Sequence, residues 1–150
     1  ISWFFSSGVT GRWPSGGLLL YRLFFGGLLA FGHGWAKLTS FGEQAGSFPD
    51  PLGIGSAASM AGAIGGEFFC ALLVMLGLGT RAAALPAMFT MAVAAFMIHA
   101  GGPLFLPAEG AKEPALLYLA AFALLLFTGA GRYSVDRLLA GAGDGAASRG

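Results

Sequence analysis

Four long apolar runs constrain the fold of this chain more than any other feature. They cover approximately Gly16–Ala36, Ala57–Leu78, Ala82–Ala100 and Pro114–Ala130. A helix needs roughly 20 residues to cross a bilayer core of about 30 Å, and the runs meet or approach that length. Their apolar residues are continuous rather than alternating, so strands are the weaker interpretation. We therefore expect an all-α, up-and-down bundle of four transmembrane helices.

The low content of charged residues indicates that the apolar excess faces lipid. Only 10 % of the 150 residues are charged, whereas a soluble domain has about a quarter, and the mean hydropathy is +0.75. The bilayer is thus the expected partner, and the net charge of +1 gives no indication of nucleic acid. The single cysteine, Cys70, excludes an internal disulfide and a CxxC redox pair.

Basic residues are distributed unevenly among the segments that flank the runs. The N-terminus, the turn between the second and third runs, and the C-terminus hold Arg12, Arg22, Arg81, Arg132, Arg137 and Arg149. The other two loops hold only Lys37 and Lys112. Because basic residues stay cytoplasmic, we predict that both termini are cytoplasmic, in a multi-pass protein of a bacterial or archaeal cytoplasmic (inner) membrane.

The chain divides into three expected parts. Residues 1–15 form an N-terminal interfacial segment, residues 16–131 the membrane domain, and residues 132–150 a cytoplasmic tail. The start, "ISWFF", suits an aromatic interface anchor, and "ISWFFSSG" lacks the basic start and cleavage pattern of a secretory signal peptide. We expect Thr80 to cap the third helix, and Ser134 to cap a short surface helix in the tail.

Two charged residues lie inside apolar runs, Arg22 in the first and Glu67 in the second. With a rise of about 1.5 Å per residue, Glu67 lies near mid-membrane, and Arg22 differs from it in depth by about one helical turn. A lone charge there costs on the order of 3 kcal/mol unless it is paired. We predict that Arg22 pairs with Glu67, either as a structural pin or as the catalytic, proton-handling part of a site.

Small residues agree with close packing of the first two helices. Gly26, Ala30 and Gly34 form a strip on the first run, and Gly62 and Gly66 form a GxxxG pattern on the second. Such residues let helix backbones approach closely in membranes. We therefore expect the first and second helices to be neighbours.

Further candidates lie toward the outer ends of the runs. His33 and Lys37, in "FGHGWAKL", and the hydroxyl of Tyr118 are the expected quinone-binding residues. His33 and His99 lie at similar depth and could ligate a haem. Two histidines are a weak signal, so we expect a quinone contact or an interfacial position rather than haem. Metal binding needs three or four ligands, and we predict none. No nucleotide-binding, nucleophile or haem-attachment motif occurs, so we expect no redox centre in the chain.

Three blocks of sequence resemble the DoxX family of small four-helix integral membrane proteins. The blocks are "LLLYRLFFGGLLAFGHGWAKL", "GGEFFCALLVMLGLGTRAAAL" and "EPALLYLAAFALLLFTGAGRYSVDRLL". The resemblance covers approximately residues 16–140. It rests on Arg22, Gly27, His33, Gly34, Lys37, Glu67, Gly77, Arg81, Glu113, Gly131, Arg132, Ser134 and Asp136. It implies the four-helix fold and a link to quinone-coupled oxidation, as in membrane subunits of thiosulfate:quinone oxidoreductase, or to membrane complexes that handle thiol and oxidative stress.

Two functional hypotheses follow. In the first, the protein is a membrane subunit of a quinone-linked oxidoreductase system that supplies an anchor and a quinone-headgroup pocket, while other membrane subunits bring the redox centre. In the alternative, it is a non-catalytic accessory or assembly subunit of a larger membrane complex. A transporter is a distant third, because four helices without internal repeats leave little room for alternating access. Homo-oligomer formation stays open in each case.

Overall fold

The computed structural model describes residues 8, 9 and 11–140 of the chain. The predicted aromatic anchor "ISWFF" and the last ten residues of the predicted tail lie outside this part. Within it the structure is all-helical, and no strand occurs among the described residues. The all-α prediction is therefore confirmed.

The helices form four stretches, three of which contain a π-helical segment (labelled η). The first consists of α1 (Arg12–Leu29), η2 (Ala30–Gly34) and α2 (Trp35–Thr39), followed by the single turn α3 (Phe41–Gln44). The second consists of α4 (Ser56–Ile64), η3 (Gly65–Cys70) and α5 (Ala71–Leu76). The third consists of α6 (Thr80–Val93) and η4 (Ala94–Ile98), and the fourth is α7 (Glu113–Thr128). Residues 135–140 are also helical.

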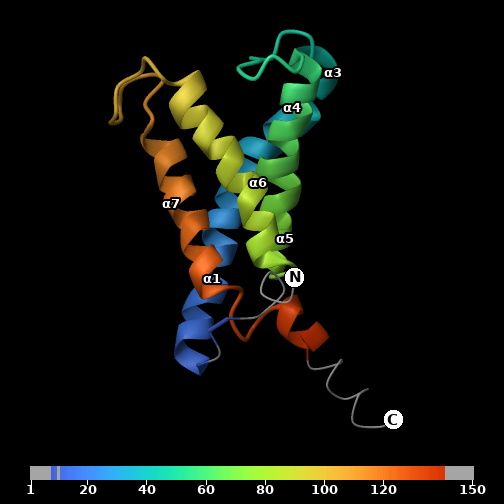
Figure 1. Ribbon diagram of the computed structural model, residues 1–150, viewed down its shortest axis with the longest axis vertical. Coiled ribbons are helices and arrows are strands. Elements are labelled where there is room, and N and C mark those ends of the chain that lie inside the picture. Colours follow the sequence, from blue (N-terminus) through green and yellow to red (C-terminus); the bar gives the residue numbers. More distant parts are fainter. Residues whose placement is uncertain (1–7, 10, 141–150) are drawn as a thin grey trace.

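Successive stretches run in opposite directions, and both long loops lie at one end of the bundle (Figure 1). In the figure the loops are at the top, and α1 begins and α7 ends at the bottom. α1 packs against α5, and α6 packs against α5 and α7. The first two stretches are therefore neighbours, as the small residues predict.

Three stretches are long and apolar enough to cross a membrane, Arg12–Thr39, Ser56–Leu76 and Thr80–Ile98. The apolar helix α7 is shorter, with 16 residues, or about 24 Å at 1.5 Å per residue. It ends where Gly129 takes a φ of 69°, a conformation that favours glycine. The structure thus contains three candidate membrane-spanning helices and a shorter apolar one.

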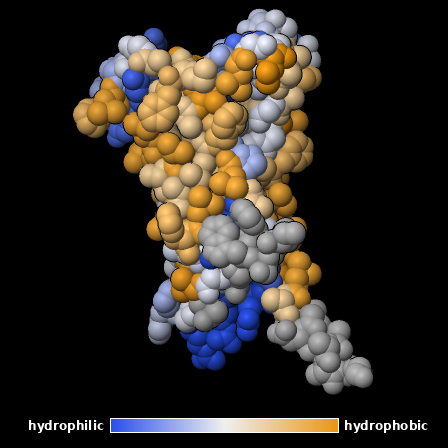
Figure 2. All heavy atoms as spheres, viewed as in Figure 1, coloured by the Kyte–Doolittle hydropathy of each residue, from blue (hydrophilic) through white to orange (hydrophobic). Residues whose placement is uncertain are grey.

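The flanks of the bundle are apolar, as a membrane protein requires. Large apolar side chains on all four stretches are exposed, among them Phe24, Phe69, Phe89 and Phe127. On the face drawn in Figure 2, hydrophobic residues cover most of the length of the helices, and hydrophilic residues gather toward the two ends. This distribution suits a chain surrounded by lipid along its length.

Close packing of the first two stretches depends on the predicted strip. A Cβ on Gly26 would lie 3.0 Å from the carbonyl oxygen of Ala71, and one on Gly34 would lie 2.7 Å from Cβ of Phe68. The prediction that the GxxxG pattern of Gly62 and Gly66 also packs against the first helix is wrong. A Cβ on Gly66 would lie 2.6 Å from Cγ2 of Thr90 in α6, and one on Gly62 would meet no atom within 4 Å, so neither glycine packs against the first stretch.

The two predicted caps have different outcomes. Ser134 caps the tail helix, because its Oγ accepts a hydrogen bond from the backbone N–H of Arg137 at 3.3 Å. The prediction for Thr80 is wrong, because Thr80 is the first residue of α6 and Gly79 occupies the capping position. The buried Oγ1 of Thr80 has no hydrogen-bond partner among the described residues.

Candidate functional site

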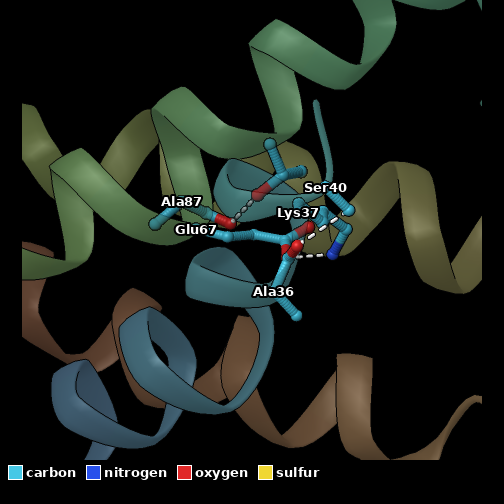
Figure 3. Close-up of polar contacts among 6 residues, drawn as sticks. Ala36, Lys37, Ser40, Glu67 and Ala87 are labelled. Carbon is cyan, nitrogen blue, oxygen red and sulfur yellow. Dashed lines mark hydrogen bonds and ion pairs between the residues drawn. The ribbon is translucent and has the colours of Figure 1, made fainter. Parts of the chain in front are cut away.

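The central feature of the site is an ion pair between Glu67 of η3 and Lys37 of α2. Figure 3 shows the two side chains directed toward each other, with Lys37 coming from the end of the first stretch. The side chain of Glu67 is 6 % exposed and that of Lys37 is 26 % exposed. The carboxylate is therefore enclosed, while the ammonium group keeps some access to the surroundings.

The predicted pair of Arg22 and Glu67 is wrong, and the helix register gives the reason. Gly34 packs directly on the backbone of Glu67, because a Cβ on Gly34 would lie 2.8 Å from the Glu67 carbonyl oxygen. Lys37 follows Gly34 by three residues, on the same helix face, and so reaches the carboxylate. Arg22 precedes Gly34 by twelve residues, or about 18 Å along the helix. The first helix continues to Thr39 rather than ending near Ala36, which brings Lys37 into the bundle.

Arg22 instead belongs to a cluster near the opposite end of the bundle. It is fully buried, and its guanidinium donates to three backbone carbonyls. Nη1 donates to Val74 and to Met75, each at 3.1 Å, and Nη2 donates to Tyr133 at 2.5 Å. Val74 and Met75 lie at the C-terminal end of α5, where unpaired carbonyls and the helix dipole favour a cation. This geometry joins the first stretch, α5 and the tail.

Asp136 of the tail helix completes this cluster. Its carboxylate accepts hydrogen bonds from the backbone N–H groups of Gly79 at 2.7 Å and Thr80 at 3.2 Å, and so caps α6. Its own backbone N–H donates to the carbonyl of Gly77 at 2.9 Å. Sequence reasoning missed this capping role, because no local pattern indicates that a residue 56 positions later caps the helix.

A cavity of about 350 Å³ lies between the second and third stretches on the loop side of Gly66. Two helix faces and a loop form most of its wall. From α4 and η3 come Ser59, Gly62, Ala63 and Glu67; from α6, η4 and the next residue come Pro86, Phe89, Thr90, Val93, Ala94, Ile98 and His99. The loop contributes Phe48, Pro49, Pro51, Leu52 and Ile54, and α2 contributes Lys37. The walls are thus mainly apolar, with the Lys37–Glu67 ion pair among their few polar groups.

The loop wall is fixed to the start of α4 by Asp50. The carboxylate accepts hydrogen bonds from Ser59 Oγ at 2.6 Å and from the backbone N–H groups of Gly55 at 2.7 Å and Ile54 at 3.0 Å. These bonds, that of Ser59 foremost, hold the pKa of Asp50 below its ordinary value, because they favour the ionised carboxylate. Asp50 therefore positions one wall of the cavity.

Two of the predicted quinone-binding residues lie elsewhere. The rings of His33 and Tyr118 pack edge to face, with centroids 5.6 Å apart, and neither is among the described residues that line the cavity. Lys37 and Glu67 do line it, and so does His99. Sequence reasoning missed Ser59 and Thr90. The only sequence signal that could have indicated them is that each is a hydroxyl side chain inside an apolar run.

Metal ligands do not gather within the described part of the chain. In residues 8, 9 and 11–140, no group of three or more His, Cys, Asp or Glu side chains is placed to hold a metal ion. The ionisable groups at the cavity are instead a lysine, a glutamate and a histidine. Such groups donate and accept hydrogen bonds and protons.

The fold and the site define a helical membrane protein with an ion pair in a mainly apolar cavity. Residues 17–100 match the DoxX family, and the chain belongs to this family. An uncharacterised protein of Haemophilus influenzae is 36 % identical over 110 residues, which cover 69 % of this chain and 77 % of the relative. No solved structure matches the chain.

Proposed function

We propose that this DoxX-family protein is a membrane subunit of a quinone-linked oxidoreductase system, and that the cavity between α4 and α6 binds the quinone headgroup. A partner subunit brings the redox centre and the electron donor. The observation that carries the proposal is a cavity of about 350 Å³, with mainly apolar walls, that contains the Lys37–Glu67 ion pair. Pockets of about 300–1,000 Å³ with few polar groups are typical of small-molecule sites.

The charges of the pair suit a neutral amphiphile. Lys37 and Glu67 carry opposite charges, so the polar part of the cavity has no net charge to attract an ionic headgroup. Lys37 can donate a hydrogen bond to a quinone carbonyl oxygen, and Glu67 can accept one from a quinol hydroxyl. Reduction of a quinone to a quinol takes up two electrons, supplied here by the partner, and two protons. In this proposal Glu67 passes protons at the ring oxygen.

The proposal includes four spans with both termini on the cytoplasmic side of a bacterial or archaeal inner membrane. α7 runs antiparallel to α6 and packs along it (Figure 1), which supports a role as a fourth span. The arginine-rich segments lie at the end where α1 begins and α7 ends, and basic residues stay cytoplasmic. The cavity then belongs to the outer half of the membrane.

Quinone affinity in nanodiscs tests the proposed function. Glu67→Gln and Lys37→Met each remove a charged hydrogen-bond partner, and such bonds contribute about 1.5–3 kcal/mol. The Kd for quinone should therefore rise by about tenfold or more. Glu109→Gln, which removes an exposed carboxylate outside the cavity, should leave the Kd unchanged. Equal affinities in all four proteins would contradict the proposal.

A second candidate is the accessory or assembly subunit. The observation that favours it is that Lys37 and Glu67 already satisfy each other within the chain. In that case the double variant Lys37→Met/Glu67→Gln should assemble with its partners nearly as well as the wild type, and either single variant should assemble less well. Normal assembly of the double variant without quinone-linked turnover would favour the quinone proposal over this one.

A further inference from the structure

The two helix faces of the cavity meet at Gly66 and separate toward the loops. A Cβ on Gly66 would lie 2.6 Å from Cγ2 of Thr90 and 2.9 Å from the carbonyl oxygen of Pro86, so η3 and α6 touch there. One turn closer to the loops, a Cβ on Gly62 would have no atom within 4 Å, although Gly62 lines the cavity. In Figure 1 the second and third stretches diverge toward the loops at the top. The cavity thus occupies the space that opens between them.

The rim of this space is apolar and exposed. Phe89 and Ile98 on the third stretch are 57 % and 41 % exposed, and Ile54 on the loop is 58 % exposed. All three line the cavity and also form part of the apolar exterior. A rim of this composition is compatible with lipid and unfavourable for an opening to water.

The loop end of the cavity has its own wall. Phe48, Pro49 and Pro51 line the cavity there, and Asp50 ties this loop to α4 through Ser59 and two backbone N–H groups. A long-tailed ligand that came from the aqueous side would have to displace this wall. Beside Gly62, between α4 and α6, no atom lies within 4 Å of a Cβ built on the glycine, so no loop or side chain covers the cavity at that point.

We propose that this gap is a lateral portal through which a lipid-soluble quinone reaches the Lys37–Glu67 pair from the bilayer. The headgroup passes Gly62 on one side and Phe89 on the other, and the isoprenoid tail stays along Phe89 and Ile98 at the rim. The proposal rests on the proposed function, since it assigns both the class of ligand and its route to the same cavity.

The test is the rate at which a long-tailed quinone binds the full chain in nanodiscs, followed by stopped-flow quenching of tryptophan fluorescence. Trp35 supplies a native signal close to the site, because its ring lies 5.8 Å from that of Phe68, the neighbour of Glu67. Gly62→Phe places a phenyl ring in the portal, at a position where the Cβ would meet no atom within 4 Å. Gly65→Phe is the matched control, because Gly65 also has open space at its Cβ but does not line the cavity.

Gly62→Phe should slow association by at least about tenfold, because the ligand must then wait for a conformational change, and Gly65→Phe should bind at close to the wild-type rate. Binding of Gly62→Phe at the wild-type rate, or equal slowing in both variants, would overturn the portal while leaving quinone binding intact. No quenching of the wild type, with a phospholipid retained in its native mass spectrum, would instead overturn the proposed function.

A second pair of variants serves if Gly62→Phe does not fold. Phe89→Ala removes a rim side chain that would contact the tail, and should raise the dissociation rate of the long-tailed quinone. Phe96→Ala removes an equally exposed phenylalanine of the same stretch that does not line the cavity, and should leave that rate unchanged. Equal rates in the two variants would overturn the portal.

Discussion

Breaking the ion pair from either side should destabilise the protein by different amounts. Lys37→Met leaves the Glu67 carboxylate in a site where its side chain is only 6 % exposed. Removing one partner of a buried pair costs about 3–5 kcal/mol, because the remaining charge is uncompensated. Since Glu67 borders a cavity rather than closely packed core, we expect the lower end of this range, about 3 kcal/mol.

Glu67→Gln should cost less. The Lys37 side chain is 26 % exposed, and a lysine at that exposure can turn its ammonium group toward water. We therefore expect a loss of about 1 kcal/mol, close to the value for exposed pairs. The double variant should lie within about 1 kcal/mol of the wild type, because it leaves no unpaired charge.

The assay is the free energy of unfolding from mixed micelles titrated with SDS, without added quinone, arranged as a double-mutant cycle. Lys112→Met is the matched control, since it removes the only other lysine of the chain, which does not line the cavity. Equal losses for the two single variants, or a double variant whose loss is the sum of both, would refute the reasoning. An additive double variant would mean that Lys37 and Glu67 do not depend on each other.

Three further predictions concern the rest of the structure. Arg22→Lys should lower the free energy of unfolding by about 2 kcal/mol or more, because an ammonium group cannot reach all three backbone carbonyls; an unchanged SDS titration would contradict this. Gly77→Ala should lower it by more than Gly53→Ala. Both glycines have φ near +70°, but only the Cβ of Gly77 would meet packed atoms, at Arg22 Nη1 and Ser134 Cβ, so equal losses would refute the packing. Because the pKa of Asp50 is lowered in the folded state, its stabilisation is present above the unfolded value of about 4 and is lost as the pH falls through the folded pKa. The protection factors of the two N–H groups capped by Asp50, which compare observed with intrinsic exchange at the same pH, should therefore fall at acid pH, and Asp50→Asn should remove this dependence.

Local patterns were sufficient to predict the helices and several of their contacts. The apolar runs place the four stretches to within a few residues. The strip from Gly26 to Gly34 identifies the face of the first stretch that packs against the second, and Ser134 marks the start of the tail helix. Each of these depends on residues close in sequence, for which helix periodicity is a direct guide.

Contacts between helices were harder to predict, because they depend on register. The lengths of the apolar runs alone place Arg22 within reach of Glu67. The first helix, however, extends to Thr39, and the partner of Glu67 is therefore Lys37. The role of Asp136 as the cap of α6 and the cavity face of Thr90 depend on how separate helices meet. Composition and local spacing do not predict which residues of separate helices come into contact.

Native mass spectrometry of the protein, extracted from its own membranes in mild detergent, tests the central claim most directly. It reports bound small molecules and attached subunits together. We expect a quinone mass on the wild-type protein and on Glu109→Gln, a reduced quinone occupancy on Glu67→Gln, and a redox partner in the same complex. An assembly that carries no quinone on this chain, or equal quinone occupancy on Glu67→Gln and the wild type, would contradict it.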